Sequence, residues 1–447
     1  MADAFEPLYT AAEMRSLEER YPGFPETAPE LMERAGTAVA LNALEAFPHA
    51  RTFAVVCGGG SNGGDGRIAA RALRESGRDA VETAAVEGAD VIVDALFGTG
   101  FQGPPRDEAA ALIERINAAP APVLAVDVPS GVDASTGEVP GAAVRADVTV
   151  TFAGAKVGLY VAPGGFHAGE VVVADIGLGS APTEHERVGR DVLELVPRKR
   201  AEDTKYTAGS VLVVGGAPGL TGAACLAAEA AFRADAGYVA VAVPPESLPV
   251  VEAKLLESVK TTWADVSAAA ARAGAVAVGP GLGRTDEARA LVVRLLAELE
   301  QPVVLDADAL HELEPGPWRP PVVLTPHAGE LGRLLGEESA WVDAHRLEAA
   351  RRAVDRFGCV CLLKGSDTIV AAPGEGVLVC GPAPPALATA GTGDVLTGVL
   401  AAYLAKGLEP RLAAAAAAVA TAEAARLAAY ERGVVAGDVV RALPLVH

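Results

Sequence analysis

Short apolar runs alternate with longer amphipathic segments along the chain from about residue 50 onward. In the first part, runs rich in Val, Ile and Ala predict β-strands at residues 51–57, 91–94, 123–127, 148–151 and 171–174. The segment 67–76 has helical period, and Gly77 follows it where glycine commonly ends a helix. This alternation predicts a mostly parallel sheet with helices on both faces, in which ligands bind beyond the carboxyl ends of the strands.

The alternation of strands and helices is interrupted over residues 179–206, which contain two prolines and the basic run 198–200. A second series follows, with strands predicted at 210–214, 238–243, 275–278, 303–306, 322–325 and 360–364 and helices at 221–236, 393–405 and 411–430. We therefore predict an α/β protein of two doubly wound, three-layer αβα domains. Residues 1–185 would form the first domain and residues 186–447 the second.

The composition narrows the class of protein. Hydrophobic residues make up 51% of the 447 residues and charged residues 21%, which excludes a disordered chain. With 58 acidic and 37 basic residues, the net charge of −21 argues against nucleic acid or an anionic membrane as a partner. Five cysteines form no disulfide framework, the start lacks a signal-peptide pattern, and the apolar stretch 412–422 is too short to span a bilayer. We expect a cytoplasmic protein.

Polar residues follow three of the strands predicted in the first domain. Asn62 and Asp65 lie in a glycine-rich segment, 58–66, whose backbone can approach an anion, and a plain turn needs neither of them. Asp94, Asp127 and Ser130 follow two further strands, although each aspartate alone could be a helix cap or a turn former. Together, Asn62, Asp94 and Ser130 offer oxygen ligands suited to a hard cation, which leaves Asp127 as a carboxylate for proton transfer.

Four motifs of this region, GGGSNGGDG, DALFGTG, DVPSGVDASTG and TFAGAKVGLYVAPG, resemble in sequence and order the NAD(P)H-hydrate epimerase domain, over roughly residues 8–180. The resemblance implies K⁺ ligands at Asn62, Asp94 and Ser130 and a substrate-contacting acid or base at Asp127. Ser61 departs from the family, which usually has a first Asn there. The implied contacts to the hydrated nucleotide are Ser61, Asn62, Gly63, Gly64, Asp65, Gly98, Thr99, Gly100, Phe101, Gln102, Gly103, Pro104 and Asp127.

In the second domain, Gly391-Thr392-Gly393-Asp394 opens a predicted helix. Glycine-rich backbone at a helix start can hold a phosphoryl group, and an aspartate in the first turn can take the proton of an attacking hydroxyl. An ordinary N-cap is the alternative. The segment 364–368 at a strand end could hold a nucleotide phosphate or turn a hairpin, and His327 in a loop after proline is a plausible site residue. Two further strand-end motifs, at 306–310 and 325–330, complete the pattern.

These motifs resemble the ADP/ATP-dependent NAD(P)H-hydrate dehydratase, which has a ribokinase-like fold, over roughly residues 200–445. The resemblance implies hydrate contacts at Ala223, Gly283, His327 and Asp394, and Mg²⁺ bound together with ADP or ATP. The implied nucleotide contacts are Lys364, Gly365, Ser366, Asp367, Thr368, Thr389, Ala390, Gly391, Thr392 and Gly393. Residues 381–385 depart from the Asn/Gly-rich pattern of the family near the nucleotide ribose.

The two resemblances together imply a bifunctional enzyme that repairs hydrated NADH and NADPH, here called NADHX and NADPHX. A Rossmann-like first domain would interconvert the R and S hydrates, with Asp127 as the candidate for ring opening or proton exchange at C6. A ribokinase-like second domain would phosphorylate the C6 hydroxyl, with Asp394 as base, and eliminate phosphate. We also expect a homo-oligomer. The alternatives are a small-molecule kinase fused to a nucleotide-binding domain, and a first domain that only binds.

Overall fold

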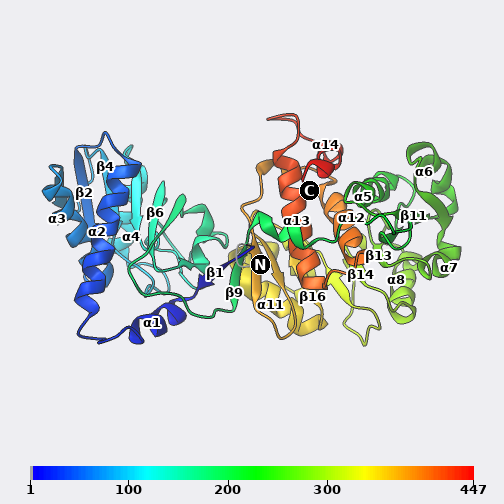
Figure 1. The fold of residues 1–447 in the computed structure, drawn as a ribbon, viewed down its shortest axis with the longest axis horizontal. Coiled ribbons are helices and arrows are strands. Elements are labelled where there is room, and N and C mark those ends of the chain that lie inside the picture. Colours follow the sequence, from blue (N-terminus) through cyan, green and yellow to red (C-terminus); the bar gives the residue numbers. More distant parts are fainter. Residues whose placement is uncertain (1–3, 447) are drawn as a thin grey trace. The chain divides into compact units, whose positions relative to one another are not determined.

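The computed structural model describes residues 4–446, and the chain divides into two compact units. One unit comprises residues 7–186 and 343–345, and is called the first unit below. The second unit comprises 1–6, 187–342 and 346–447. Each contains its own parallel sheet with helices on both faces, so the predicted α/β class is confirmed (Figure 1).

In the first part of the chain, helices or short loops connect successive strands. The elements are β1 (Phe5–Tyr9), α1 (Ala11–Glu19), α2 (Ala28–Ala46), β2 (Thr52–Cys57), α3 (Ser61–Glu75), β3 (Asp79–Glu82), β4 (Val91–Ala95), α4 (Asp107–Ala118), β5 (Val123–Val126), β6 (Val148–Phe152), β7 (Ala155–Lys156), β8 (Glu170–Ala174) and β9 (His185–Val188). Among the described residues, the sheet has the strand order β3-β2-β4-β5-β6-β8, and each pair is parallel.

Strand β2 shows why the first unit has three layers. Successive side chains of a strand point to opposite faces, so a strand between two helical layers is apolar throughout. Phe53 and Val55 pack with residues of α2 and α3, whereas Ala54 and Val56 pack with Ile113 of α4 on the other face. The reversal of strand order between β2 and β4 opens a crevice at the carboxyl edge, which is where α3 begins.

The remaining elements repeat the alternation on a longer sheet. They are β10 (Ser210–Val214), α5 (Thr221–Arg233), β11 (Tyr238–Val243), α6 (Leu248–Lys254), β12 (Val259–Thr262), α7 (Val266–Ala270), β13 (Ala275–Val278), α8 (Asp286–Glu298), β14 (Val303–Leu305), β15 (Val322–Leu324), α9 (Ala328–Leu335), α10 (Ser339–Ala344), α11 (Arg346–Phe357), β16 (Val360–Leu363), β17 (Thr368–Ala371), β18 (Val377–Cys380), α12 (Thr392–Ala405), α13 (Pro410–Arg426) and α14 (Ala436–Ala442).

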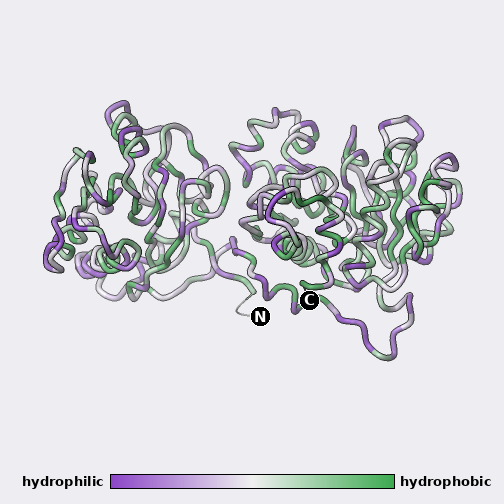
Figure 2. The backbone as a smooth tube through the Cα atoms, turned by 90° about the horizontal axis from the view of Figure 1, so that it is seen from above, coloured by the Kyte–Doolittle hydropathy of each residue, from purple (hydrophilic) through white to green (hydrophobic). Residues whose placement is uncertain are grey.

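Within residues 187–446, the strand order is β12-β11-β10-β13-β14-β15-β16-β17-β18. The pairs are parallel as far as β16 and antiparallel from β16 to β18. Helices α5, α12 and α13 cover one face, and α12 is apolar nearly all round because it is buried between its neighbours. Figure 2 shows hydrophobic segments in the interior of this unit and hydrophilic ones along its outside. Gly398 allows α12 to approach α5, since a Cβ there would lie 2.1 Å from the carbonyl oxygen of Ala227.

Three predicted helix boundaries differ from the structure by three residues or more, and the smallest of these differences is the end of α5 at Arg233 rather than at 236. Helix α3 begins at Ser61, inside the glycine-rich segment, rather than at residue 67. Glycines disfavour a helix by propensity, but here close packing requires them, because a Cβ on Gly63 would lie 2.0 Å from the carbonyl oxygen of Gly58. Helix α13 ends at Arg426 rather than at 430, and the exposed Tyr430 beyond it buries too little surface to extend the helix.

Candidate active sites

Three residues predicted as cation ligands meet at the carboxyl edge of the first unit. Ser130 donates from its backbone N–H to Asp94 Oδ2 (2.8 Å) and from its hydroxyl to Asp94 Oδ1 (2.7 Å). Asn62 Nδ2 donates to the carbonyl oxygen of Phe97 (2.9 Å). The backbone N–H of Phe97 in turn donates to Ser130 Oγ (2.9 Å). Burial raises the pKa of Asp94 to about 6, although its hydrogen bonds from Ser130 and Leu96 act in the opposite direction.

This set fits a hard, weakly charged cation. It offers one carboxylate and several neutral oxygens, rather than the sulfur and imidazole ligands that transition metals prefer. Within residues 4–446, no group of three or more His, Cys, Asp or Glu side chains could hold a metal ion. A Cβ on Gly98 would lie 2.9 Å from Asn62 Oδ1, so glycine at this position leaves that oxygen accessible.

Asp127 lies at the end of β5 in a backbone conformation that few residues other than glycine adopt, with φ of 67°. Its Oδ1 contacts Lys156 Nζ at 2.8 Å and accepts a hydrogen bond from Thr151 Oγ1 at 3.2 Å. Lys156 also donates to Thr151 Oγ1 and to the carbonyl oxygen of Phe152, both at 2.9 Å, so its three N–H bonds all have acceptors. Oδ2 has a weaker contact, the N–H of Thr99 at 3.3 Å.

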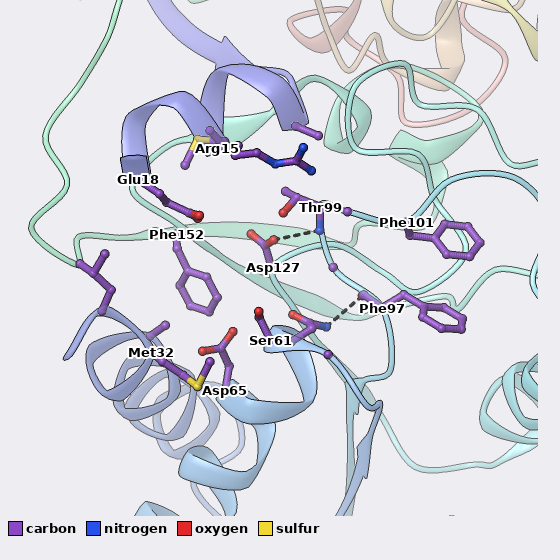
Figure 3. A pocket seen from close by; sticks show the side chains of 18 of the residues that line it. Arg15, Glu18, Met32, Ser61, Asp65, Phe97, Thr99, Phe101, Asp127 and Phe152 are labelled. Atoms are coloured by element: carbon purple, nitrogen blue, oxygen red, sulfur yellow. Dashed lines mark hydrogen bonds between the residues drawn. The ribbon is translucent and has the colours of Figure 1, made fainter. Parts of the chain in front are cut away.

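The Oδ2 side of Asp127 faces a cavity of about 670 Å³ between α1, α2 and the start of α3 (Figure 3). Of the predicted substrate contacts, Ser61, Asn62, Asp65, Gly98, Thr99, Gly100, Phe101, Gln102 and Asp127 line it. The other four, Gly63, Gly64, Gly103 and Pro104, are not among its lining residues. Phe97 and Phe101 stack with ring centroids 4.8 Å apart at the cavity wall, which supplies an apolar surface beside the polar one.

Two more carboxyl groups belong to the same cavity. Burial, followed by repulsion from Asp127 and Glu18, raises the pKa of Asp65 to about 8, and Lys156 only partly offsets this. The pKa of Glu18 is also raised, first by burial and then by Asp127. Asp65 and Asp127 both point into the cavity in Figure 3. A protonated carboxyl and a lysine-paired carboxylate can serve as an acid and a base in one site.

Sequence reasoning missed Lys156, Glu18 and Thr151. Lys156 lies within the motif TFAGAKVGLYVAPG but was given no role, although it is the only lysine in the first 198 residues. Only 1% of the surface of Lys156 is exposed, and the local sequence does not predict this burial. A lone lysine in an apolar segment was the available signal, because a buried lysine needs a charged partner.

In the second unit, the segments 364–368 and 391–394 meet around Lys364. Its Nζ contacts Asp306 Oδ1 at 2.7 Å and Glu330 Oε2 at 3.7 Å, and lies 3.5 Å from where a Cβ on Gly393 would be. Burial alone would lower the pKa of Lys364, but the charges of Asp306, Glu330 and Asp394 raise it. The lysine is therefore held as a cation at the N-terminus of α12, where anionic groups are favoured.

Asp394 lies in the first turn of α12, after Gly391, whose φ of 91° is a conformation suited to glycine. Burial, followed by the charges of Asp306 and Asp308, raises the pKa of Asp394 to about 7, and Lys364 acts against them. The carboxyl group is thus poised between its two protonation states near neutral pH. That is the property of a general base that must also release its proton.

The segment 364–367 turns the hairpin between β16 and β17, so the hairpin alternative was correct in its geometry. Asp367, a predicted nucleotide contact, is 4% exposed, and both its carboxylate oxygens lie within 2.9 Å of Arg346 Nε. Arg346 also donates to the carbonyl oxygen of Lys364 at 3.3 Å. Asp367 therefore fixes the hairpin through Arg346, and its contact with a nucleotide stays a prediction.

The hydroxyl groups of the two predicted threonine contacts beside the glycine cradle are bonded to backbone carbonyl oxygens, of their own loop in both cases and also of Val434 in the case of Thr389. Thr389 Oγ1 donates to the carbonyl oxygen of Val434 at 3.2 Å, and Thr392 Oγ1 donates to that of Leu387 at 2.8 Å. Ala390, Gly391 and Gly393 present backbone in this stretch. The hydroxyl groups thus hold the loop in shape, and its backbone remains as the part that can face a phosphate.

Predicted hydrate contacts also lie at this edge. The exposed His327 caps α9: its Nδ1 accepts from the N–H of Gly329 at 3.0 Å, and its Nε2 lies 3.5 Å from Glu330 Oε1. Gly283 donates its N–H to Asp308 Oδ2 at 2.9 Å. Ala223 lies in the first turn of α5, and a Cβ on Gly281 would approach its methyl group to 3.2 Å.

The fold and the two sites define a class: an α/β enzyme with two nucleotide-type sites at the carboxyl edges of separate sheets. One site is built around a carboxylate–lysine pair, and the other around a lysine and an aspartate at a glycine-rich helix start. Within residues 4–446, no helix is long and apolar enough to cross a membrane.

Comparison with known proteins specifies the class further. Residues 211–444 match the model of the NAD(P)H-hydrate dehydratase family, and residues 28–87 and 78–158 match that of the YjeF-related protein N-terminus. The bifunctional NAD(P)H-hydrate repair enzyme Nnr of Moorella thermoacetica is 36% identical, over 98% of this chain and 96% of that protein. The Escherichia coli enzyme of the same name is also 36% identical, over 93% and 88%. The chain belongs to the family of bifunctional NAD(P)H-hydrate repair enzymes.

A solved structure is similar to the second unit. The ADP/ATP-dependent NAD(P)H-hydrate dehydratase of Bacillus subtilis, co-crystallised with ATP/Mg²⁺, is 29% identical with a TM-score of 0.53, covering 58% of this chain and 96% of that one. A ribokinase-like superfamily protein of Enterococcus faecalis has 25% identity and the same TM-score, covering 60% and 96%. These likenesses confirm the ribokinase-like expectation for the second unit.

Proposed function

We propose that the first unit interconverts the R and S hydrates of NADH and NADPH, and that the second dehydrates the S hydrate using ADP or ATP. The observation that carries the proposal is the presence of two separate, complete sites on one chain. Asp127 faces a cavity at the edge of one sheet, and Asp394 opens the glycine cradle at the edge of the other. Family membership over nearly the whole chain supports the same assignment.

Epimerisation at C6 of the hydrate requires a base for the C6 hydroxyl. That carbon bears both the hydroxyl and the ring nitrogen N1, so removal of the hydroxyl proton allows the C6–N1 bond to break and a C6 aldehyde to form. Reclosure on the other face of the aldehyde inverts C6. Asp127 Oδ2 takes the proton, because Oδ1 is already bonded to Lys156 and Thr151. The electron pair of the broken bond goes to N1, and the protonated Asp65 is the acid that can supply a proton there.

Dehydration requires a better leaving group than hydroxide. Asp394 takes the proton of the C6 hydroxyl, whose oxygen then attacks the terminal phosphoryl group of ADP and releases AMP. The C6–O bond of the resulting phosphate ester then breaks and inorganic phosphate leaves, while the C5 proton passes to water and the C5=C6 double bond forms again. The backbone around Gly393 and the Lys364 ammonium bind the phosphoryl oxygens. Mg²⁺ entering with the nucleotide supplies further charge neutralisation to the phosphates.

Potassium is part of the proposal for the first unit. Asn62, Asp94, Ser130 and the carbonyl oxygen of Phe97 are the oxygens that would hold it. Bound there, the ion orders the loop that carries Thr99 and contributes positive charge beside the cavity. We expect the epimerisation rate to fall about tenfold when K⁺ is replaced by a bulky organic cation at constant ionic strength, since the site then loses its charge. Equal rates in the two buffers, with ion removal verified, would refute the potassium site.

Two finer expectations accompany the proposal and stay predictions: a homo-oligomer and a cytoplasmic location. Light scattering of the purified protein tests the first, and cell fractionation tests the second.

One assay tests the main proposal. Purified protein is mixed with a known ratio of R and S hydrates, with or without ADP and Mg²⁺, and the absorbance of the reduced nicotinamide is followed. Full recovery of both epimers with ADP, and epimer exchange without it, are the expected results. A stable phosphorylated product instead of NADH would favour the kinase alternative.

A further inference from the structure

The strand-end segment 306–310 contains an aspartate that the proposed reaction leaves without a role. Asp306 follows β14, and 1% of its surface is exposed, so its carboxylate does not reach a bound substrate. Each of its oxygens is nevertheless bonded. Oδ1 accepts from Lys364 Nζ (2.7 Å) and Thr325 Oγ1 (2.8 Å), and Oδ2 accepts from Thr397 Oγ1 (2.8 Å).

The three donors come from three different elements. Thr325 follows β15, Lys364 follows β16, and Thr397 is on α12, three residues after Asp394. Residues three apart on a helix lie on one face, so the bond from Thr397 fixes the turn of α12 that carries the proposed base. One carboxylate thus connects the phosphate-facing lysine to the helix that holds the base.

The arrangement also explains why a charged group is buried here. A buried carboxylate is costly unless it is paired and hydrogen-bonded, and Asp306 has one cation and two hydroxyl donors. Glu330 is the other carboxylate at Lys364, but its oxygen is 3.7 Å from Nζ, against 2.7 Å for Asp306. Asp306 is therefore the group that sets where the ammonium lies relative to Gly393.

We propose that Asp306 is a positioning residue for dehydration, which holds Lys364 at the N-terminus of α12 and is itself fixed by Thr397. The inference rests on the proposed function of the second unit and deepens it. It gives the segment 306–310 a role, which is to place the Lys364 ammonium that would contact the nucleotide phosphates. Asp306 and Thr397 are both buried, so Asp306 acts through Lys364 and through its charge on Asp394, and Thr397 acts through Asp306.

The sharpest test is at Thr397, because Thr397→Val keeps the shape of the side chain and removes only its hydroxyl. We expect kcat of dehydration to fall roughly tenfold, as for a lost hydrogen bond to a charged group. Thr397→Ser, which keeps the hydroxyl, should return kcat to within about twofold of wild type. Asp306→Asn should lower kcat about 100-fold and raise the KM for ADP, since Lys364 then lacks its anchor.

Thr421→Val is the matched control. Thr421 is also buried and donates to the carbonyl oxygen of Ala417 within α13, away from Asp306. It should keep the wild-type kcat and KM for ADP, and its melting temperature measures what the loss of a buried hydroxyl costs at a place away from Asp306. Epimerisation by the same full-length preparations serves as the concentration standard.

Two results would overturn the inference: wild-type kcat and KM for ADP in both Thr397→Val and Asp306→Asn, or equal losses in Thr421→Val and Thr397→Val. A wild-type protein that fails to dehydrate the S hydrate would instead refute the proposed function. Equilibrium binding of ADP would then still decide the role of Asp306. Weaker binding by Asp306→Asn than by wild type supports it, and equal binding refutes it.

Discussion

The two sites of this chain use the same pair of residue types, an aspartate and a lysine, in opposite ways. In the first unit, Lys156 contacts the proposed base Asp127 itself, at 2.8 Å. In the second, Lys364 is held by a different carboxylate, Asp306, and the proposed base Asp394 is left with a pKa raised to about 7. The position of the lysine therefore decides whether the ammonium contacts the proposed base directly or is held by a second carboxylate.

The difference suits the two proposed reactions. Epimerisation returns the proton it takes, so a base fixed in one orientation by Lys156 and a left-handed backbone at Asp127 is sufficient. Dehydration transfers a phosphoryl group, so the lysine must remain available to phosphate oxygens. Asp306 allows this, because it binds Nζ from the buried side and leaves the side toward Gly393 open.

The largest expected effect is that of Asp394→Asn. It should lower dehydration of the S hydrate about 1000-fold, within the range that general-base removal usually gives. Epimerisation should stay at the wild-type rate, because Asp127 and its cavity belong to the other unit. NADH recovery measured by absorbance checks the first rate and chromatographic separation of the epimers the second. Recovery close to that of wild type would remove Asp394 from the mechanism.

The reciprocal variant is Asp127→Ala. Epimer exchange should fall about 100-fold or more, since the hydroxyl proton then has no base. With ADP present, the S hydrate should disappear at the wild-type rate and the R hydrate only as fast as it epimerises spontaneously. Following both epimers by chromatography checks this. If the R hydrate were consumed as fast as by wild type, the epimerase site would have to lie elsewhere.

Lys156→Met sharpens the comparison at the lysine. The change removes the charge and keeps much of the side-chain volume, so Asp127 is left as an unpaired buried carboxylate. Epimerisation should fall about 10- to 100-fold at pH 7 and recover partly at higher pH, because a buried carboxylate without its cation is harder to ionise. Dehydration by the same preparation is the control. An unchanged pH profile would mean that Lys156 is only structural.

The sequence predicted the helices and strands far better than it predicted the side-chain contacts within the two sites. Strands at 210–214, 238–243 and 275–278 have the predicted bounds, because unbroken apolar runs reflect burial on both faces of a sheet. Lys156 and Asp127 are 29 residues apart, and Thr397 and Asp306 are 91 apart. Such pairs depend on which strands become neighbours, and no local pattern encodes that. The start of α3 was misplaced for a related reason, since close packing outweighs the low helix propensity of glycine.

A smaller expected effect is the pH dependence of dehydration. Asp394 must be deprotonated to act as a base, and its raised pKa of about 7 places the loss of activity on the acid side of neutrality. We expect kcat/KM for the S hydrate to be about half its plateau value at pH 7 and to fall about tenfold per unit below pH 6. Epimerisation in the same samples should not follow this curve, because its proposed base has a different environment.

Asp308→Asn tests whether the ionisation of Asp394 causes this loss of dehydration activity in acid. The charge of Asp308 is one of those that raise the pKa of Asp394, after burial and Asp306. An asparagine oxygen can still accept the N–H of Gly283, so the loop at that residue keeps its contact. The acid-side inflection of kcat/KM should therefore move to lower pH, by less than one unit because Asp308 is the smallest contribution. An inflection that stays in place, or moves to higher pH, would show that a group other than Asp394 limits dehydration in acid.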